Sequence, residues 1–147
     1  MSLKTLHICL EQICKFRLGA GGARIIDDTY NANPSSLAAA LETLASMPGK
    51  KLLVLGDMAK LGDEADAWHS WAGQAVRTAG VIELFAMGDL ARLAAESFGD
   101  GAHHLTGHQA LVKALLPKLR RGVIVLVKGS RCMTMENLVA ELLHRAC

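Results

Sequence analysis

Residues 123–131 read Val-Ile-Val-Leu-Val-Lys-Gly-Ser-Arg, an unbroken apolar run that ends in a polar turn. The run has the length of a strand, and its lack of polar residues predicts a strand covered on both faces, as in a parallel sheet. Beyond the turn, apolar side chains return at helical spacing over residues 135–143. This stretch therefore predicts a buried strand that leads through a polar turn into a helix.

The same order of strand and helix recurs toward the N-terminus. Apolar runs predict earlier strands at residues 24–28, 51–55, 83–87 and 103–105. The segments after them have helical spacing, and helices are expected at residues 33–47, 63–79, 90–98 and 109–119. This alternation predicts a three-layer, Rossmann-like α/β fold in which a mostly parallel sheet carries helices on both faces.

The N-terminal residues 1–18 do not follow this pattern. Met1-Ser2-Leu3 resembles a cloning leader, and residues 4–16 carry apolar side chains at helical spacing. They predict either a short helix packed on the domain or a tail outside it, and both alternatives stay open. Because Gly19-Ala-Gly-Gly22 is typical of a flexible break, the compact domain is expected to span residues 19–147.

Composition narrows the class of protein. The 147 residues suit a single domain, and 51% hydrophobic with 20% charged residues is an ordinary globular balance. A net charge of +2 does not favour nucleic acid as a partner, and the apolar runs are too short for membrane insertion. The four cysteines form no C-x-x-C pair, so no metal site is expected and reduced thiols in the cytoplasm are the simplest interpretation.

Three polar loops follow predicted strands, at residues 27–33, 56–62 and 128–131. In open parallel sheets, ligands bind at the carboxyl ends of the strands, where these loops would meet. We therefore expect a binding site at this edge, with the first and last loops side by side.

The first loop is rich in hydrogen-bonding side chains, namely Asp27, Asp28, Tyr30, Asn31 and Asn33. A carboxylate at a strand end can accept hydrogen bonds from the hydroxyls of a ribose, and carboxamides suit a nucleobase or a peptide backbone. The alternative is a plain turn, because Asp and Asn favour turns and an Asn N-cap followed by Pro is a typical helix start.

The last loop combines Lys128, Gly129, Ser130 and Arg131 before a predicted helix. Free backbone N–H groups at a helix N-terminus attract anions, and the two cationic side chains add full charges. A glycine would let an anion approach the backbone. The loop therefore predicts a carboxylate or phosphate site, and the alternative is an ordinary capped helix.

The middle loop gives a weaker signal. It carries Asp57 and Lys60, and His69 follows within the next predicted helix. A histidine in a helix is more often a packed or surface residue than a catalyst. The chain contains no G-x-x-x-x-G-K-[ST] phosphate loop and no G-x-S-x-G nucleophile motif.

Together the three loops resemble the Mur ligase family. The residues that carry the resemblance are Asp-Asp-Thr-Tyr-Asn-Ala-Asn-Pro at 27–34, Gly-Asp-Met-x-x-Leu-Gly at 56–62, and Val-Lys-Gly-Ser-Arg at 127–131 with Met135-Glu136. Within the family they are most similar to the members that add D-alanyl-D-alanine (D-Ala-D-Ala) to the peptidoglycan precursor. The resemblance covers about residues 23–143 and leaves out the first sixteen.

The resemblance implies the third domain of a cytoplasmic, ATP-dependent ligase that acts on UDP-N-acetylmuramoyl-tripeptide (UDP-MurNAc-tripeptide). An N-terminal domain would hold the UDP-sugar end, and a central domain would bring the phosphate loop and the magnesium (Mg) ligands. Neither is encoded in these 147 residues, so the chain alone is expected to be inactive and to hold no metal.

For the site, the resemblance implies Asp28 at the ATP ribose, with the adenine side lined by Tyr30, Asn31 and Asn33. It places the last loop near the dipeptide or the phosphoryl groups, through Lys128, Gly129, Ser130 and Arg131. Secondary candidates are Asp27, Asp57 and His69.

Three rival interpretations stay open at this point. The chain could be a free-standing nucleotide- or anion-binding α/β module. It could be a receiver-like regulatory domain, since paired aspartates at a strand end suit a phospho-acceptor site. It could also be a folate-adding or other amino-acid ligase of the same superfamily.

Overall fold

The computed structural model describes residues 15–144, which form one six-stranded sheet with helices on both faces. The strands are β1 (Lys15–Leu18), β2 (Arg24–Asp28), β3 (Lys50–Gly56), β4 (Glu83–Met87), β5 (Ala102–Leu105) and β6 (Val123–Lys128). The α-helices are α2 (Pro34–Ala45), α3 (Ala65–Thr78), α4 (Ala91–Phe98), α5 (His108–Leu115) and α6 (Met135–His144). Every strand and helix predicted after residue 19 is therefore present, with ends shifted by a few residues.

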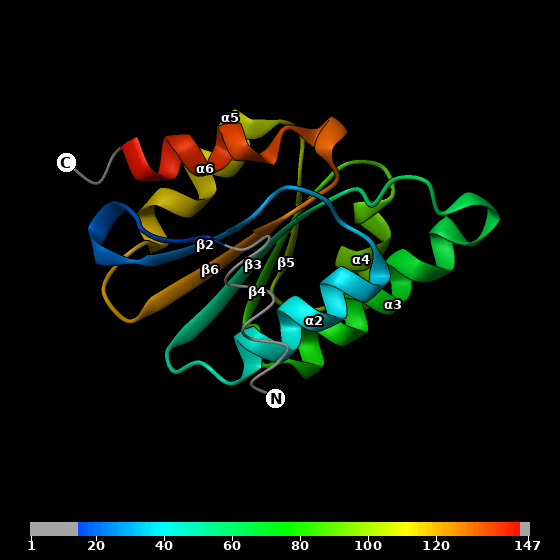
Figure 1. Ribbon diagram of the computed structural model, residues 1–147, viewed down its shortest axis with the longest axis horizontal. Helices are drawn as coiled ribbons and strands as arrows, with labels where there is room; N and C mark the ends of the chain where they lie inside the picture. The colour runs from blue at the N-terminus through cyan, green and yellow to red at the C-terminus, as the bar shows by residue number, and fades with distance from the viewer. Residues whose placement is uncertain (1–14, 145–147) are drawn as a thin grey trace.

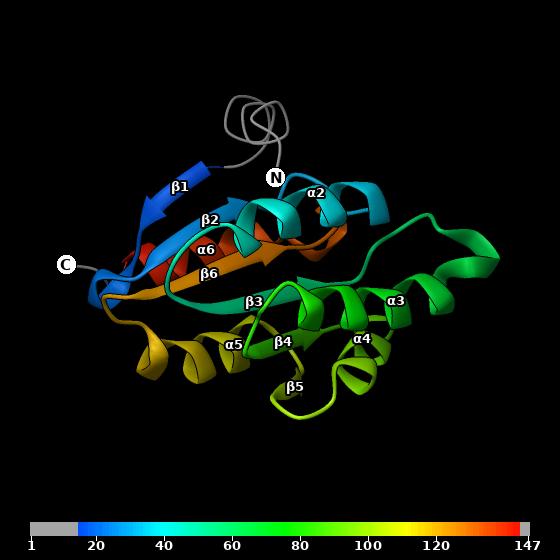
Figure 2. The ribbon, with the colours of Figure 1, turned by 90° about the horizontal axis from the view of Figure 1, so that it is seen from below.

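The sheet has the strand order β1-β2-β6-β3-β4-β5, and all its neighbours are parallel except β1 and β2. The last strand of the chain, β6, lies at the centre between β2 and β3, as Figure 2 shows. Its six residues are all buried, which agrees with the unbroken apolar run in its sequence. The prediction of a mostly parallel α/β sheet is confirmed.

Helices cover both faces of the sheet (Figure 1), and a large hydrophobic core fills each side. Successive strand residues pack into opposite cores: Leu53 packs with α2, α3 and α4, whereas Leu52 packs with α5 and α6. The three-layer prediction is confirmed by this division. Among the described residues, no helix is long and apolar enough to cross a membrane.

The start of α2 follows the sequence signal closely. The Asn33 side chain accepts a hydrogen bond from Ser36 N at 2.8 Å, and Ser36 Oγ accepts one from Asn33 N at 3.1 Å. This capping box, with Pro34 in the first turn, satisfies N–H groups that the helix leaves unpaired. Asn33 is therefore held rigidly at the carboxyl edge of the sheet.

The N-terminal side differs from expectation. Lys15 and Phe16, the end of the expected amphipathic helix, lie in β1, which pairs antiparallel with β2; residues 4–14 of that helix lie outside the described residues. The sheet thus begins four residues before Gly19. The glycine-rich stretch is an ordered turn, η2 (Ala20–Gly22), rather than a flexible break, and a Cβ at Gly21 would overlap the Leu119 carbonyl.

The last helix begins at the residue that the sequence predicted, but the polar turn does not open it directly. A three-residue 3-10 helix, η5 (Arg131–Met133), separates Ser130 from α6, which starts at Met135. Ser130 therefore precedes η5 rather than α6, and its side chain makes no cap hydrogen bond. The turn still delivers residues 130–132 to the carboxyl edge of the sheet.

Candidate functional site

The first and last loops lie side by side at one rim of the sheet. Because β2 and β6 are parallel neighbours, their register places Asp28 opposite Lys128, one hundred residues later. The Lys128 ammonium donates to Asp28 Oδ2 at 2.8 Å and to the Asn31 carbonyl at 3.1 Å. The expected juxtaposition of residues 27–33 and 128–131 is confirmed, and a buried ion pair ties them together.

This ion pair is sealed from solvent. The Lys128 side chain is 0% exposed and the Asp28 side chain 3% exposed. Burial raises the pKa of Asp28 against the opposing effect of Lys128, and burial lowers the pKa of Lys128 against the opposing effect of Asp28. Asp28 Oδ1 is also buried and has no hydrogen-bond donor among residues 15–144. Lys128 is therefore placed to brace the loops from below rather than to meet a ligand directly.

Above the ion pair, residues from all three loops line one pocket of about 590 Å³. It is lined by Tyr30, Asn31, Ala32, Asn33, Ala59, Lys60, Leu61, Ser130, Arg131 and Cys132. Its charged side chains are two cations, Lys60 and Arg131, and no carboxylate is among them. Such a volume suits a small ligand, and the charge balance favours an anionic one.

Tyr30 and Arg131 join the two loops across the pocket. The Arg131 guanidinium lies 5.1 Å from the centre of the Tyr30 ring, within the range of a cation–π contact. Tyr30 is 62% exposed, so its ring is open to a flat partner. Asn31 and Asn33 stand beside it, as donors and acceptors along the same wall.

Asp27 stays at the margin of this arrangement. Its carboxylate accepts a hydrogen bond from Thr29 Oγ1 at 2.6 Å, and it does not line the pocket. The contact closes the turn that leads from β2 to Tyr30. The plain-turn interpretation thus applies to Asp27, whereas Tyr30, Asn31 and Asn33 reach the pocket.

Asp57 supports neighbouring elements instead of lining the pocket. Its carboxylate accepts from Ala91 N at 2.7 Å, at the start of α4, and its carbonyl accepts from Ser130 N at 3.1 Å. A Cβ at Gly88 would overlap this carboxylate, so glycine is required there. Asp57 therefore fixes the middle and last loops relative to each other.

His69 is a buried structural residue. Its Nε2 accepts a hydrogen bond from Met58 N at 3.0 Å, so the proton must reside on Nδ1, which donates to Ala65 O at 2.7 Å. Both ring nitrogens are thereby used, and the side chain is fully buried. The packed-residue interpretation is the one that these contacts support, and His69 holds the middle loop in place.

Gly129 has a packing role at the base of the last loop. A Cβ there would lie 2.7 Å from Met135 Cγ and 3.3 Å from the Gly56 Cα, so a larger residue would push the loop outward. Ser130 is buried, and its Oγ lies 3.1 Å from Cys132 Sγ. Arg131 is the member of this loop whose charge is exposed at the pocket.

Among the pocket residues that carry a charge or a thiol, Lys60 and Cys132 were not sequence candidates. Lys60 belongs to the middle loop, but its sequence context predicted no role for it. Its φ of 62° is unusual for a residue other than glycine, and strained backbone of this kind is enriched at binding sites. Both residues reach the pocket because the strand order places the three loops next to one another, which the sequence does not show.

The described part of the chain has no group of three or more His, Cys, Asp or Glu side chains placed to hold a metal ion. The pocket itself offers amides, hydroxyls and cations. Its donor set fits a phosphate or carboxylate and does not fit Mg²⁺, which requires anionic oxygen ligands.

Comparison with known sequences agrees with these motifs. The family model described as "Mur ligase, glutamate ligase domain" matches residues 14–131. The UDP-N-acetylmuramoyl-tripeptide–D-alanyl-D-alanine ligase of Escherichia coli K12 is 39% identical over 119 residues, covering 80% of this chain and 26% of the relative. The ligase of the same name from Buchnera aphidicola is 36% identical over 124 residues, covering 83% and 27%. The chain thus spans about a quarter of these curated relatives.

Solved structures show the same fold. MurF from Acinetobacter baumannii has a TM-score of 0.78 at 30% identity, covering 98% of this chain and 34% of that one. MurF ligase from Thermotoga maritima in complex with ADP has a TM-score of 0.75 at 26% identity, covering 90% and 30%. A receiver-like domain is therefore the wrong interpretation, and the buried, ion-paired Asp28 is no open phospho-acceptor. By its family model, its loop motifs and its fold, the chain belongs to the Mur ligase family.

Proposed function

We propose that this chain is the C-terminal domain of an ATP-dependent ligase that joins D-Ala-D-Ala to UDP-MurNAc-tripeptide. The observation that carries the proposal is the cationic pocket, to which all three family motifs contribute residues. The curated relatives bear the name of this activity, and one structural relative is an ADP complex. In this proposal the enzyme has N-terminal and central domains in addition to these 147 residues, and it acts in the cytoplasm.

The two walls of the pocket have different proposed partners. Tyr30, Asn31 and Asn33 offer a flat ring and two carboxamides to the nucleotide. Arg131, with Ser130 beneath it, faces the phosphoryl groups or the carboxylate of the dipeptide. Asp28 Oδ1, buried without a donor among residues 15–144, is the acceptor assigned to a ribose hydroxyl once residues 29–32 move aside.

The chemistry itself would occur at groups that this chain does not contain. Ligases of this class activate a carboxylate as an acyl phosphate, which the incoming amine attacks, leaving ADP and phosphate. Mg²⁺, when bound, would neutralise the phosphates during this transfer. With no carboxylate lining the pocket, we assign the Mg²⁺ ligands to the central domain and assign binding and orientation to this chain.

The path of the chain supports a site shared with a preceding domain. Lys15, at the start of β1, pairs with Asp27 near the carboxyl end of β2. Because β1 runs antiparallel to β2, the chain enters the sheet close to the rim that carries the pocket. A domain preceding β1 would thus be tethered beside the pocket, as closure over a shared ATP requires.

A nucleotide titration tests the binding role. ADP added to the ¹⁵N-labelled chain is expected to shift amides of residues 30–33, 59–61 and 130–132, with weak affinity because the phosphate cradle is missing. Arg131→Ala should weaken binding, and the matched control Lys113→Ala, an exposed cation on α5, should not. Shifts confined to other surfaces, or a dissociation constant in the micromolar range or below, would contradict the proposal.

The acceptor is tested separately, on the full-length enzyme. D-Ala-D-Ala should support ADP release with the tripeptide precursor, whereas single amino acids, glutamate included, should not. Activity with glutamate on a folate-type substrate would instead favour another ligase of the superfamily. If no phosphate loop precedes this chain in its reading frame, the free-standing anion-binding module becomes the better interpretation.

A further inference from the structure

The turn that presents Arg131 and Cys132 to the pocket has little local support. η5 comprises three residues, and it is closed by the bonds Met133 N to Ser130 O at 3.0 Å and Thr134 N to Arg131 O at 3.1 Å. Thr134, which ends it, has a φ of 49°. The left-handed region is unfavourable for a β-branched residue, so the turn stores strain where it leaves the pocket.

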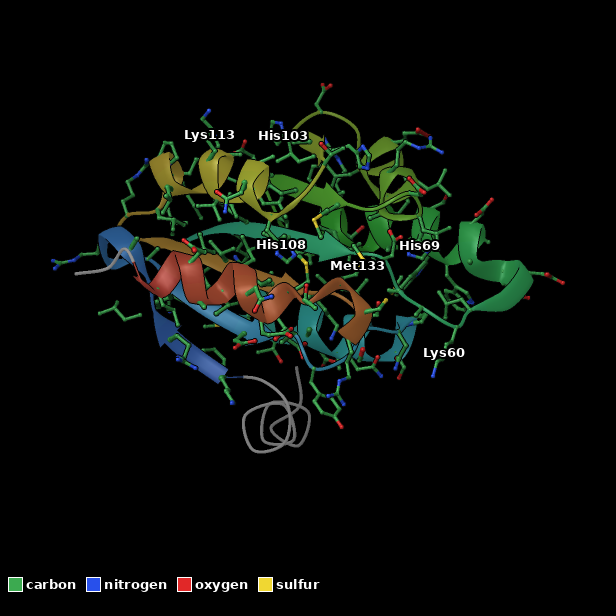
Figure 3. The ribbon with its side chains drawn as sticks, turned by 90° about the horizontal axis from the view of Figure 1, so that it is seen from above. Lys60, His69, His103, His108, Lys113 and Met133 are labelled. Carbon is green, nitrogen blue, oxygen red and sulfur yellow. The ribbon has the colours of Figure 1, made fainter. Side chains whose placement is uncertain are left out.

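A side chain from another layer reaches this turn. His108, the first residue of α5, places Nε2 3.0 Å from the Met133 carbonyl oxygen. A carbonyl only accepts, so Nε2 carries the proton and donates. Figure 3 shows His108 and Met133 close together on the inner side of α5, with Lys113 on its outer side. The contact therefore spans the gap between α5 and the segment that enters α6.

The Met133 side chain holds the turn on its other side. Its Cβ, Cγ and Cε atoms lie over Gly56 at the end of β3, where an added Cβ would be 3.2 Å from Met133 Cγ. Within residues 15–144, His108 is the side chain from outside the turn that hydrogen-bonds to it. The turn is thus fixed between α5 and β3, while Arg131 projects toward Tyr30.

We propose that His108 is a positioning residue for the pocket: it holds the 130–134 turn so that Arg131 faces an anionic ligand beside Tyr30. His108 does not line the pocket, and it acts through the Met133 carbonyl. The proposal rests on the proposed function only in using a nucleotide as one of its probes.

Cys132 provides a reporter within the turn itself. Its thiol is exposed, and Sγ lies 3.1 Å from the buried Ser130 Oγ. In a background with Cys9, Cys14 and Cys147 replaced by serine, Cys132 is the single thiol of the chain. Its alkylation rate by iodoacetamide then reports how firmly the turn is held, whether or not any nucleotide binds.

The variants separate positioning from general stability. His108→Ala is expected to raise the alkylation rate about fivefold and to weaken ADP binding by a similar factor, as loss of one hydrogen bond implies. His108→Gln, whose Nε2 can donate to the same carbonyl, should restore both values. Lys113→Ala, on the outer side of α5, is the control and should match the wild type.

The proposal is overturned if Cys132 in His108→Ala is alkylated at the wild-type rate. It is also overturned if His108→Ala and His108→Gln have equal alkylation rates. If the wild-type chain itself binds no ADP, the proposed function fails, but alkylation still decides the role of His108. Should His108→Ala not fold, nitrogen NMR of the wild-type histidines, which distinguishes a protonated from an unprotonated ring nitrogen, decides instead. An unprotonated Nε2 on His108 would then overturn the proposal, and a protonated one supports it.

Discussion

At the scale of single residues, the candidate site depends on an ion pair that is almost completely buried. Asp28 and Lys128 lie beneath the pocket, and Lys128 also supports the Asn31 carbonyl. Burying two charges is costly, and removing one partner leaves the other without compensation. The pair is therefore more important for the shape of the loops than for net stability.

We expect Asp28→Asn to lower the free energy of unfolding by about 3–5 kcal/mol, because the Lys128 ammonium loses its counter-charge. The double variant Asp28→Asn/Lys128→Met should lose much less, since no charge remains buried. Urea denaturation of the two single variants, the double variant and the wild type measures this coupling. Strictly additive losses would show that the two side chains do not act as a pair.

The stability of the same variants is expected to depend differently on pH. Burial lowers the pKa of Lys128 below its ordinary value of 10.5, and Asp28→Asn removes the charge that opposes this shift. Between the lowered pKa and 10.5, the unfolded chain binds more protons than the folded chain, so stability rises with pH. Asp28→Asn should therefore regain stability toward pH 10.5 more steeply than the double variant. Parallel curves for the two variants would contradict this explanation.

At the scale of elements, the loops are held by contacts from helices that lie outside the pocket. His69 of α3 fixes the middle loop through Met58 N, and Asp57 joins that loop to the start of α4. A carboxylate at a helix N-terminus satisfies a free N–H group and interacts favourably with the helix dipole. Residues that looked like candidates for chemistry thus set the geometry of the rim.

Asp57→Ala is expected to destabilise the chain by about 0.5–2 kcal/mol, the usual cost of losing a helix cap. Thermal or urea unfolding measures the loss, and Asp63→Ala, an exposed acidic residue on the nearby η3 (Gly62–Glu64), serves as the control. Equal stability of the two variants would mean that the bond from Ala91 N contributes nothing.

The edge of the sheet at β4 and β5 has its own pH dependence. Burial alone would raise the pKa of Glu83, but hydrogen bonds from His103 and Lys118 outweigh it and hold the pKa below 4.5. Stability from this group is present above pH 4.5 and is lost as pH falls through the lowered pKa. Glu83→Gln should therefore flatten the acid limb of the stability curve, measured by urea unfolding between about pH 2 and 5. An unchanged acid limb would argue against the contribution of this cluster.

At the scale of the whole molecule, the sheet brings the three polar loops to one rim. Two hydrophobic cores fill the faces of the sheet, and the loops after β2, β3 and β6 meet at the same end. Since β6 lies between β2 and β3, its loop touches both of the others. An open pocket at a rim suits a domain that closes over a ligand held by another domain.

We therefore expect no ligase turnover from the isolated chain. The measurement is release of ADP or phosphate in the presence of ATP, Mg²⁺, UDP-MurNAc-tripeptide and D-Ala-D-Ala. The full-length enzyme is the positive control, and Arg131→Ala in that enzyme should reduce turnover. Precursor-dependent release by the isolated chain would contradict the proposal that N-terminal and central domains supply the catalytic groups.

The alternation of apolar runs and helical spacing was enough to predict the layers, the helices on both faces and the mostly parallel sheet, because burial on two faces leaves a direct mark on each strand. The Asn-Pro helix start and the nearness of the first and last loops were predictable for similar local or topological reasons. β1 was missed, although its Lys-Phe-Arg-Leu alternation is a strand signal, because it is short and exposed on an edge.

What the sequence alone determined, then, is the class of fold, the rim where the polar loops meet and the residue types gathered there. Only the tertiary structure decided which of them face outward. The strand register buries Lys128 against Asp28. The Asp57 carboxylate binds the start of α4, and His69 binds the Met58 amide. Lys60 and Arg131, in contrast, line the pocket. The physical reason is that a polar side chain binds whichever partner the packing brings within reach, and those partners lie far away along the chain.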